Sequence, residues 1–179
     1  KRALITGISG FVGSHLTEYL ISQNINVTGF AHPTHPLDNL SDVENKINII
    51  KLDILNKPLL EKKLYNEKFD YIFHLAAFSS PNQSFIDPKA TLENNILGQL
   101  YLLECLVKNK SNAKILVVGS ADEYGDVDEK KLPITELTEF APSSPYAVSK
   151  IVQDMLGLQF YLHNKLQIVR VRPFNHIGP

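Results

Sequence analysis

Tyr146 and Lys150 are the pair of side chains whose types and spacing most clearly suggest chemistry. They stand four residues apart in the stretch YAVSK, so a helix would place the phenol and the ammonium on one face. Pro145 suits a first helical turn, with Ser143 or Ser144 as the cap. The helix dipole and the lysine charge are both expected to lower the pKa of Tyr146 from its usual value of about 10. A phenol in that environment serves as a general acid or base.

Ser120 is a third candidate for the same chemistry. It directly follows Lys114–Gly119, a run whose apolar character predicts a strand buried on both faces. Ligands of open α/β sheets bind at the carboxyl edge of the strands, so a hydroxyl there could hydrogen-bond a reacting oxygen. A Tyr–Lys pair alone more often marks a solvated helix face. Its combination with Ser120 and with a glycine-rich turn favours a catalytic site.

That turn joins the first expected strand, Ala3–Thr6, to a helix expected from Phe11. Glycines let the turn close, let main-chain N–H groups approach a pyrophosphate, and let the helix pack on the strand. The helix N-terminus adds a partial positive charge that faces the anion. A tight turn without a ligand is the alternative, but the position at the first strand–helix junction favours a cofactor. The cofactor-binding residues expected here are Gly7, Ser9, Gly10, Phe11, Val12 and Gly13.

The end of the second expected strand, Asn26–Phe30, bears on which dinucleotide binds. NAD-binding versions of the motif carry an Asp or Glu there, which holds the ribose 2′-hydroxyl. Here Ala31 and His32 follow, and the missing negative charge tolerates a 2′-phosphate, which a protonated His32 could contact. NADP(H) is therefore favoured, with NAD(H) as the alternative. Asp53 has two open roles, contact with the adenine amino group and capping of the helix that follows.

Strands and helices alternate along the whole chain. The expected strands are Ala3–Thr6, Asn26–Phe30, Ile47–Leu52, Asp70–Leu75, Lys114–Gly119 and Gln167–Val171. The expected helices are Phe11–Gln23, Leu59–Tyr65, Ala90–Lys108 and Pro145–Leu162. Such alternation predicts an α/β fold with a doubly wound parallel Rossmann sheet of about six strands in the order 3-2-1-4-5-6. Ala31–Lys46 and Tyr124–Ser144 resist assignment, and loops of that length are commonly functional.

The composition limits the class of protein. With 18 Lys+Arg against 19 Asp+Glu, the formal net charge of the 179 residues is −1, which argues against nucleic acid or a membrane surface as a partner. Apolar residues make up 44%, as in ordinary globular domains. Cys105 is the only cysteine, so no intrachain disulfide can form and a cytoplasmic location fits. The six histidines show no metal-ligand spacing.

Together the motifs resemble the extended short-chain dehydrogenase/reductase superfamily and, within it, the NAD-dependent epimerase/dehydratase family. The segments that carry the resemblance are Thr6–Gly13, His74–Ala77, Asn95–Gly98, Gly119-Ser120 with Tyr124-Gly125, Tyr146–Lys150 and Arg172–Pro179. The last segment is the most specific. It is similar to the motif of GDP-4-keto-6-deoxy-D-mannose reductases, relatives of the GDP-mannose 4,6-dehydratases.

The resemblance implies roles for individual residues. Ser120, Tyr146 and Lys150 would form the catalytic triad. Asn95 would anchor the active-site helix, and Asn175 would touch the sugar nucleotide. Beyond the glycine turn, the cofactor would be contacted by His32, Asp53, Ile54, Leu75, Ala76, Ala77, Asn95, Tyr146, Lys150 and Pro173.

Two departures from the family pattern bear on the reaction. The dehydratases carry a glutamate base two residues after Ser120, where this sequence has Asp122, and dTDP-glucose-type enzymes carry an aspartate acid at the position of Ala121. This incomplete pair favours a reductase that uses NAD(P)H on the 4-keto group of a GDP-4-keto-6-deoxy-hexose, with Asp122 as a substrate contact. A 4,6-dehydratase or epimerase is the alternative within the family. A non-catalytic NADP-binding regulatory protein is the alternative from another class.

Residues 1–179 are expected to form one NAD(P)-binding Rossmann domain, cut before the C-terminal substrate lobe of the family. Two of the expected helices carry apolar residues on more than one face. Together with the resemblance, this predicts a homodimer built on a four-helix bundle. Coverage by the C-terminal lobe is the alternative. The residues concerned are Leu102, Leu106, Met155, Leu158 and Leu162.

Overall fold

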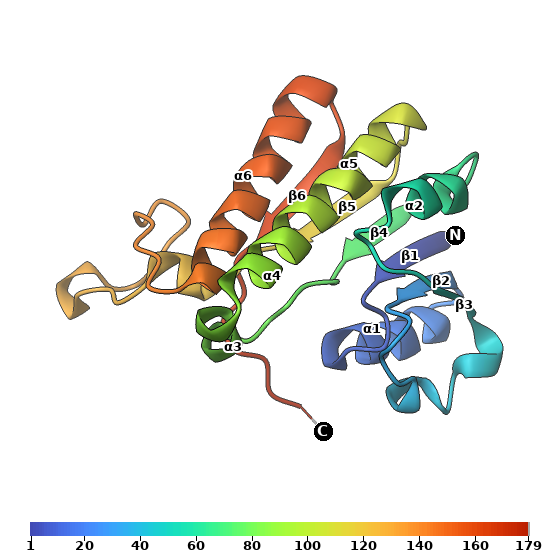
Figure 1. Cartoon of the computed structure of the whole chain (residues 1–179), viewed down its shortest axis with the longest axis horizontal. Coiled ribbons are helices and arrows are strands. Elements are labelled where there is room, and N and C mark those ends of the chain that lie inside the picture. The colour runs from blue at the N-terminus through green and yellow to red at the C-terminus, as the bar shows by residue number, and fades with distance from the viewer. Residues whose placement is uncertain (179) are drawn as a thin grey trace.

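The structure, a computed structural model, describes residues 1–178 and contains one six-stranded sheet (Figure 1). The strands are β1 (Arg2–Thr6), β2 (Asn26–Ala31), β3 (Asn48–Lys51), β4 (Tyr71–His74), β5 (Lys114–Val118) and β6 (Gln167–Val171). Their order is β3-β2-β1-β4-β5-β6, as predicted. Every neighbouring pair is parallel, so the carboxyl ends of all the strands share one edge.

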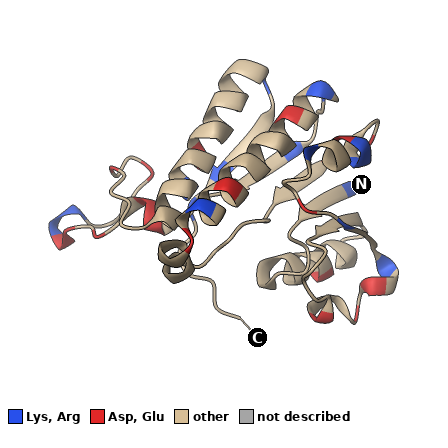
Figure 2. Ribbon diagram, viewed as in Figure 1, with Lys and Arg blue, Asp and Glu red and all other residues tan. Residues whose placement is uncertain are grey.

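Charged residues of both signs are mixed over the fold. Figure 2 shows Lys and Arg interspersed with Asp and Glu along the same helices and loops, in keeping with the balance of 18 cations against 19 anions. Within residues 1–178, no helix has both the length and the apolar character that a membrane span requires.

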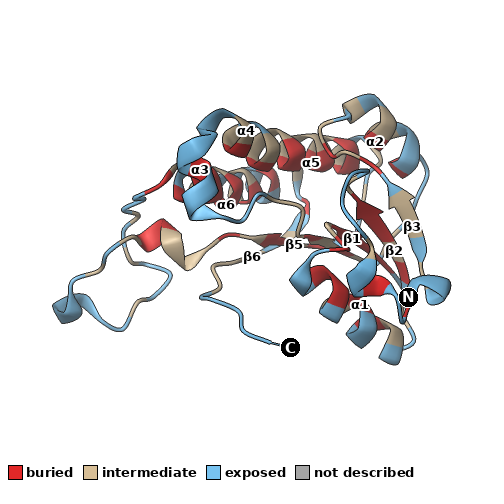
Figure 3. Cartoon of the chain, turned by 60° about the horizontal axis from the view of Figure 1, so that its bottom comes forward, coloured by how far each residue is buried: buried red, intermediate tan, exposed pale blue. Residues whose placement is uncertain are grey.

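Helices cover both faces of the sheet (Figure 3). α1 (Phe11–Ser22) lies on one face, and α2 (Lys57–Leu64), α5 (Gly98–Lys108) and α6 (Pro145–Asn164) lie on the other. β1 pairs with both β2 and β4, so the chain extends the sheet from β1 first to one side and then to the other. The connecting helices change from one face of the sheet to the other after β3. Ligands of doubly wound sheets bind at this switch point.

Each face of the sheet has its own hydrophobic core. Leu4 joins the larger cluster, which includes Leu103 of α5 and Phe160 of α6. Its neighbour Ile5 joins the smaller cluster, which includes Leu20 of α1, because successive side chains of a strand point to opposite faces. Full burial of such a side chain contributes about 1.5–3 kcal/mol, so both clusters hold the ligand-binding edge of β1 in place.

Ser144, rather than Ser143, begins α6. Its hydroxyl accepts the N–H of Ala147 at 3.0 Å, and Pro145 occupies the first turn, where a missing N–H costs nothing. The helix ends before Lys165, which adopts a left-handed conformation with φ of 60°. α6 therefore begins at the edge of the sheet where ligands bind.

The helix predicted over Ala90–Lys108 consists of three consecutive pieces. α4 (Pro88–Leu92) leads into a π-helical turn, η3 (Glu93–Leu97), and then into α5. Such turns are often found at functional sites. A further helix, α3 (Pro81–Ile86), was not predicted, since six residues are too few to show a helical period.

The two unassigned stretches contain only short 3-10 turns. In the first are η1 (Asp38–Leu40) and η2 (Glu44–Lys46), and in the second is η5 (Glu129–Lys131), within a loop that projects from the body of the molecule (Figure 1). η4 (Ala121–Tyr124) follows β5 directly and lies at the candidate site.

Candidate active site

Tyr146, Lys150 and Ser120 come together at the carboxyl end of β5. The Lys150 ammonium lies 5.8 Å from the centre of the Tyr146 ring, so the two side chains share a face of α6 as their spacing predicted. Lys150 Nζ also donates a hydrogen bond to the carbonyl oxygen of Val118 at 2.9 Å. The Ser120 side chain lies near enough to the Tyr146 phenol to lower its pKa. The site therefore presents a phenol, a hydroxyl and an ammonium side by side.

The predicted lowering of the Tyr146 pKa is wrong. Burial raises the pKa of this phenol above its ordinary value. The Ser120 side chain lowers the pKa of Tyr146, whereas the charges of Asp122 and Glu123 raise it. The helix dipole and the lysine charge are outweighed because the phenolate would be almost fully removed from water. Tyr146 therefore keeps its proton at neutral pH and is suited to donating one.

The pKa of Lys150 shifts in the opposite direction to that of Tyr146. Burial lowers its pKa to about 8, against a raising effect of the Glu123 charge. Lys150 is thus protonated at neutral pH and places a positive charge beside the phenol. A rise of pH above about 8 would remove that charge.

A chain of hydrogen bonds fixes the first turn of α6. Asn95 Nδ2 donates to Ser149 Oγ at 2.9 Å, and Ser149 Oγ donates to the carbonyl oxygen of Tyr146 at 2.6 Å. Asn95 also bonds both main-chain groups of Phe78, at 2.7 and 3.0 Å. The geometry thus makes Asn95 an anchor between the loop after β4 and α6. Its contact with the cofactor stays a prediction.

Ser84 holds the other side of this turn and was not predicted. It is fully buried, accepts the N–H of Tyr146 at 3.1 Å and donates to the carbonyl oxygen of Pro81 at 2.6 Å. Because Ser84 lies in α3, which has no clear period, no pattern in the sequence pointed to it. It positions the main chain of the candidate proton donor.

The glycine turn has the geometry that a pyrophosphate needs. Gly7 has φ of +72°, and a Cβ there would lie 2.8 Å from the main-chain nitrogen of Ala76. A Cβ on Gly13 would overlap the carbonyl oxygen of Gly7. Gly10 is the N-cap of α1 and has no side chain to cap the first-turn N–H groups, which leaves these groups to an anion.

The remaining residues predicted around the turn lie along the same edge. Phe11 and Val12 are exposed at the start of α1, and Ser9 is buried. The N–H of Ala76 donates to Thr6 Oγ1 at 3.2 Å, which holds Leu75–Ala77 beside the glycines. These contacts are those expected of walls around a nucleotide.

His74 is a buried residue of this edge whose environment was not foreseen. Its Nδ1 lies 2.8 Å from Thr6 Oγ1, and its Nε2 has no hydrogen-bond partner within residues 1–178. Burial, followed by the charge of Lys150, lowers the pKa of the imidazole to about 3. His74 is therefore neutral and lies between Thr6, next to the glycine turn, and Lys150 of the candidate site.

His32 and Asp53 meet at the end of β2. Their atoms Nε2 and Oδ2 are 3.9 Å apart, and His32 Nδ1 lies 2.9 Å from Thr34 Oγ1. The alternative that Asp53 caps α2 is wrong, because Asn56 is the cap and accepts the N–H of Leu59 at 3.1 Å. Contact with the adenine remains the prediction for Asp53.

Ala31, where NAD-binding relatives of the motif place a carboxylate, is fully buried. Ile54 is also buried, and its side chain packs over Gly98 in the larger core. The partly exposed side chain at this end of β2 is therefore His32. Within the described residues, no three His, Cys, Asp or Glu side chains are grouped to hold a metal ion. A cavity of about 310 Å³ is lined here by Ser9, His35, Pro36, Asp38 and Asn39.

The residues predicted to meet the sugar follow β5 and β6. The N–H of Ala121 donates to the carbonyl oxygen of Pro173 at 2.9 Å, which ties the segment after β6 to η4. Asp122 is half-buried and Asn175 is exposed. Pro179, the last residue of the C-terminal motif, lies outside the described residues.

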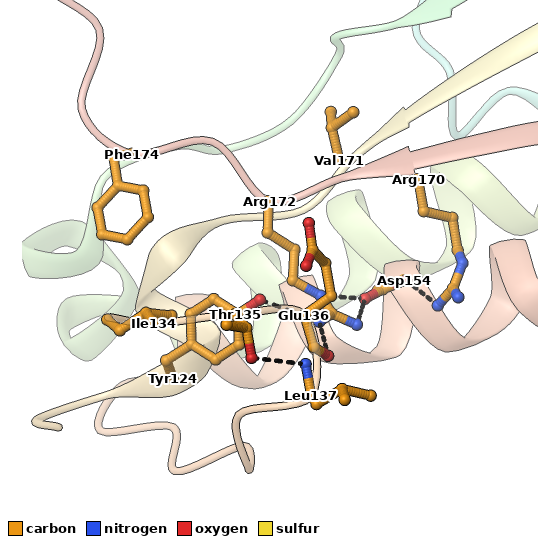
Figure 4. A pocket seen from close by; sticks show the side chains of 10 residues that line it. All are labelled: Tyr124, Ile134, Thr135, Glu136, Leu137, Asp154, Arg170, Val171, Arg172 and Phe174. Carbon is orange, nitrogen blue, oxygen red and sulfur yellow. Dashed lines mark hydrogen bonds and ion pairs between the residues drawn. The ribbon is translucent and has the colours of Figure 1, made fainter. Parts of the chain in front are cut away.

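Arg172 links three elements behind this segment (Figure 4). Its Nη2 lies 2.5 Å from Asp154 Oδ2, and its Nε lies 3.1 Å from Glu123 Oε2. Arg172 Nη1 donates to the Tyr124 hydroxyl and to the carbonyl oxygen of Glu136, both at 3.1 Å. Tyr124 and Arg172 lie in the segments that carry the family resemblance, and Glu123 stands at capping-box spacing from Ser120, which follows β5.

A cavity of about 470 Å³ opens beside Arg172. Figure 4 shows the guanidinium between the loop before α6 and the helix itself. The residues that line this cavity are Tyr124, Ile134, Thr135, Glu136, Leu137, Asp154, Arg170, Val171, Arg172 and Phe174.

Known proteins show the same arrangement of sequence and fold. The GDP-6-deoxy-D-mannose reductase of Pseudomonas aeruginosa is 36% identical over 179 residues, which is 100% of this chain and 53% of that protein. The structure of RMD from Pseudomonas aeruginosa, complexed with NADPH, has a TM-score of 0.81 at 35% identity and covers 100% of this chain and 55% of its own. The chain thus spans about half the length of the curated relatives it matches.

A second solved structure extends the likeness to epimerases. The UDP-N-acetylglucosamine 4-epimerase from Methanobrevibacter ruminantium, in complex with UDP-N-acetylmuramic acid, has a TM-score of 0.89 at 32% identity, over 100% of this chain and 56% of its own. The sequence pattern of the GDP-mannose 4,6 dehydratase family matches residues 4–179. On this match, the chain belongs to the GDP-mannose 4,6-dehydratase family.

Proposed function

We propose that this chain is the dinucleotide-binding part of a nucleotide-sugar reductase that uses NAD(P)H on the 4-keto group of a GDP-4-keto-6-deoxy-hexose. The observation that carries the proposal is the buried Tyr146 phenol, which keeps its proton at neutral pH beside Ser120 and Lys150. A carbonyl reduction needs such a proton donor. The similarity to a GDP-6-deoxy-D-mannose reductase supports the substrate class.

The glycine turn fits a dinucleotide. Gly7 and Gly13 lie so close to other main-chain atoms that a Cβ at either position would overlap them, and the first-turn N–H groups of α1 have no side-chain cap. Bound there, NAD(P)H would supply the hydride for the sugar C4. NADP(H) is favoured because neither Ala31 nor His32 would repel a 2′-phosphate, and the NADPH complex of RMD supports this choice. NAD(H) is the alternative.

The residues of this chain would act as follows. Tyr146 donates its proton to the 4-keto oxygen as negative charge develops there. The Ser120 hydroxyl hydrogen-bonds the same oxygen and stabilises the forming alkoxide. The Lys150 ammonium holds the nicotinamide ribose and stabilises the phenolate that remains. Asn95 and Ser84 keep the first turn of α6 in place.

A 4,6-dehydratase or epimerase is the second candidate. Asp122 lies close enough to Tyr146 for its charge to raise the phenol pKa, so this carboxylate could also reach a sugar. Its side chain is one methylene shorter than the family glutamate, and Ala121 supplies no acid. A regulatory protein that binds NADP without turnover would have no use for a proton donor at this position.

We also propose that the full-length protein is a homodimer that pairs through α6. Val148, Met155 and Leu162 recur every seven residues and are 41%, 37% and 57% exposed, a spacing typical of helix-to-helix packing. Leu102 and Leu106 are instead buried within the chain, because α5 packs on the sheet. Light scattering of the full-length protein at micromolar concentration tests this, and a monomer would contradict it. The cytoplasmic location stays a prediction.

The reaction is tested by incubating the full-length protein with nucleotide sugars while NADPH absorbance is followed. A reductase consumes one NADPH for each 4-keto sugar converted. Product formed without net loss of NADPH would instead identify a dehydratase or epimerase.

A further inference from the structure

Glu123 lies buried behind Ser120 and supports it. Glu123 Oε1 accepts the main-chain N–H of Ser120 at 2.8 Å, and the Ser120 hydroxyl accepts the N–H of Asp122 at 3.2 Å. A Cβ at Gly119 would overlap Glu123 Oε1, so the glycine allows the carboxyl group to lie against the main chain. The place of the Ser120 hydroxyl thus depends on Glu123.

The second oxygen of Glu123 meets a charge but no hydrogen-bond donor. Oε2 lies 3.1 Å from Arg172 Nε, and that nitrogen donates its one N–H to Asp154 Oδ2 at 2.6 Å. Within residues 1–178, Glu123 Oε2 has no hydrogen-bond partner. A buried carboxylate oxygen without a donor disfavours the charged form.

Glu123 is accordingly able to change its charge near neutral pH. Burial raises its pKa to about 7, against the lowering effect of the Ser120 N–H. The charged Glu123 in turn favours protonation of both Tyr146 and Lys150. The titratable or charged groups that interact with Glu123 are Tyr146, Lys150 and Asp154 of α6 and Arg172 after β6.

We propose that Glu123 is a positioning residue for the reduction: its carboxyl group holds Ser120 against Tyr146 and, through Arg172, ties η4 to α6. This inference rests on the proposed function. Glu123 is fully buried and acts through Ser120, not on the substrate. Its charge adds a second effect, because it keeps the proton donor and the ammonium protonated as the pH rises.

Two substitutions in the full-length protein separate these effects. Glu123→Gln keeps the shape but removes the charge that faces Arg172. We expect kcat to fall about tenfold with the KM for NADPH unchanged. The alkaline limb of the pH profile of kcat should shift to lower pH by about half to one pH unit. Glu123→Asp keeps the charge but cannot reach Ser120, so kcat should fall while the limb stays in place.

Glu139→Gln removes an exposed carboxylate from the loop between η5 and α6 and is the matched control. It should leave kcat and the pH profile unchanged. An alkaline limb that Glu123→Gln does not move, or a normal kcat in folded Glu123→Asp, would overturn the proposal.

A second measurement needs no turnover. The amide ¹⁵N shift of Ser120, followed by NMR against pH, should inflect near pH 7 because its acceptor titrates there, and Glu123→Gln should abolish the inflection. A wild-type shift that stays flat between about pH 5 and 9 would overturn the role of Glu123 even in an active reductase. If the inflection is seen but the protein has no reductase activity, the contact between Glu123 and Ser120 stands and the proposed function is wrong.

Discussion

The glycine turn after β1 and the candidate catalytic face, formed by Ser120, Tyr146 and Lys150, share one edge of the sheet. The turn depends on main-chain groups, and the candidate catalytic face depends on side chains. In the turn, Gly7 and Gly13 let main-chain atoms approach more closely than a side chain would allow, so that main-chain N–H groups can approach a pyrophosphate. On the candidate catalytic face, the buried side chains of Tyr146 and Lys150 have pKa values that shift with burial and with nearby charges. Main-chain groups do not titrate, whereas a buried side chain responds to every charge around it. The turn should therefore be sensitive to volume, and the catalytic face to charge and pH.

Tyr146→Phe should have the largest effect and should confine it to the catalytic face. The substitution removes the transferable proton and keeps the ring that packs, so kcat should fall by roughly two to four orders of magnitude. The Kd for NADPH, measured by fluorescence titration, should stay unchanged because the glycine turn is intact. Near-normal turnover in a folded Tyr146→Phe protein would reject the proton-donor assignment and favour the regulatory alternative.

Gly13→Ala is the converse change, confined to the turn. Its Cβ would overlap the carbonyl oxygen of Gly7, and overpacking of this kind costs about 1–3 kcal/mol. If that strain opens the turn, the Kd for NADPH should rise about 10- to 100-fold. Gly157→Ala is the control, because this glycine lies in α6, outside the turn, and its Cβ would meet only the side chains of Arg170 and Ile168. Equal losses in the two variants would contradict the turn geometry.

His74 lies between the two regions and should make the fold sensitive to acid. The folded imidazole has a pKa of about 3, against the ordinary value of 6.5, so only the unfolded chain takes up its proton between these values. Proton uptake by the unfolded chain should therefore lower the free energy of unfolding by about 2 kcal/mol between pH 7 and pH 5. Urea unfolding across this range measures the slope.

His74→Gln should flatten that slope by the same amount, whatever its effect on stability at pH 7. His176→Gln, an exposed histidine, is the control and should leave the slope unchanged. A wild-type slope that survives His74→Gln would place the acid sensitivity elsewhere.

His32→Ala should have the smallest effect, at the ribose end of the turn. If His32 contacts a 2′-phosphate, the Kd for NADPH should rise about two- to fivefold, as expected for a partly exposed charge pair. NADH lacks that phosphate and is the internal control. An equal loss of affinity for both cofactors would show that His32 does not determine the preference for NADPH over NADH.

The sequence was informative where function follows from local pattern. The strand order, the glycine turn and the shared face of Tyr146 and Lys150 all followed from spacing alone. Each depends on neighbours within a few residues, or on the fixed handedness of strand–helix–strand connections.

Features that depend on burial or on distant partners were missed. The Tyr146 pKa has the opposite sign from the prediction because its desolvation arises from packing that no local pattern encodes. Ser84 meets Tyr146 across 62 positions, and Arg172 meets Tyr124 across 48. Capping was one of two roles left open for Asp53, and Asn56 fills it, since both residue types suit the start of a helix.

The most direct test of the central claim follows the transferred hydrogen. The full-length protein would convert GDP-4-keto-6-deoxymannose with NADPH deuterated at the transferred position of C4, and the product would be analysed by mass spectrometry and NMR. We expect one deuterium on the sugar C4 for each NADPH oxidised, and Tyr146→Phe should slow its appearance. Product without deuterium, formed while NADPH stays intact, would contradict the central claim.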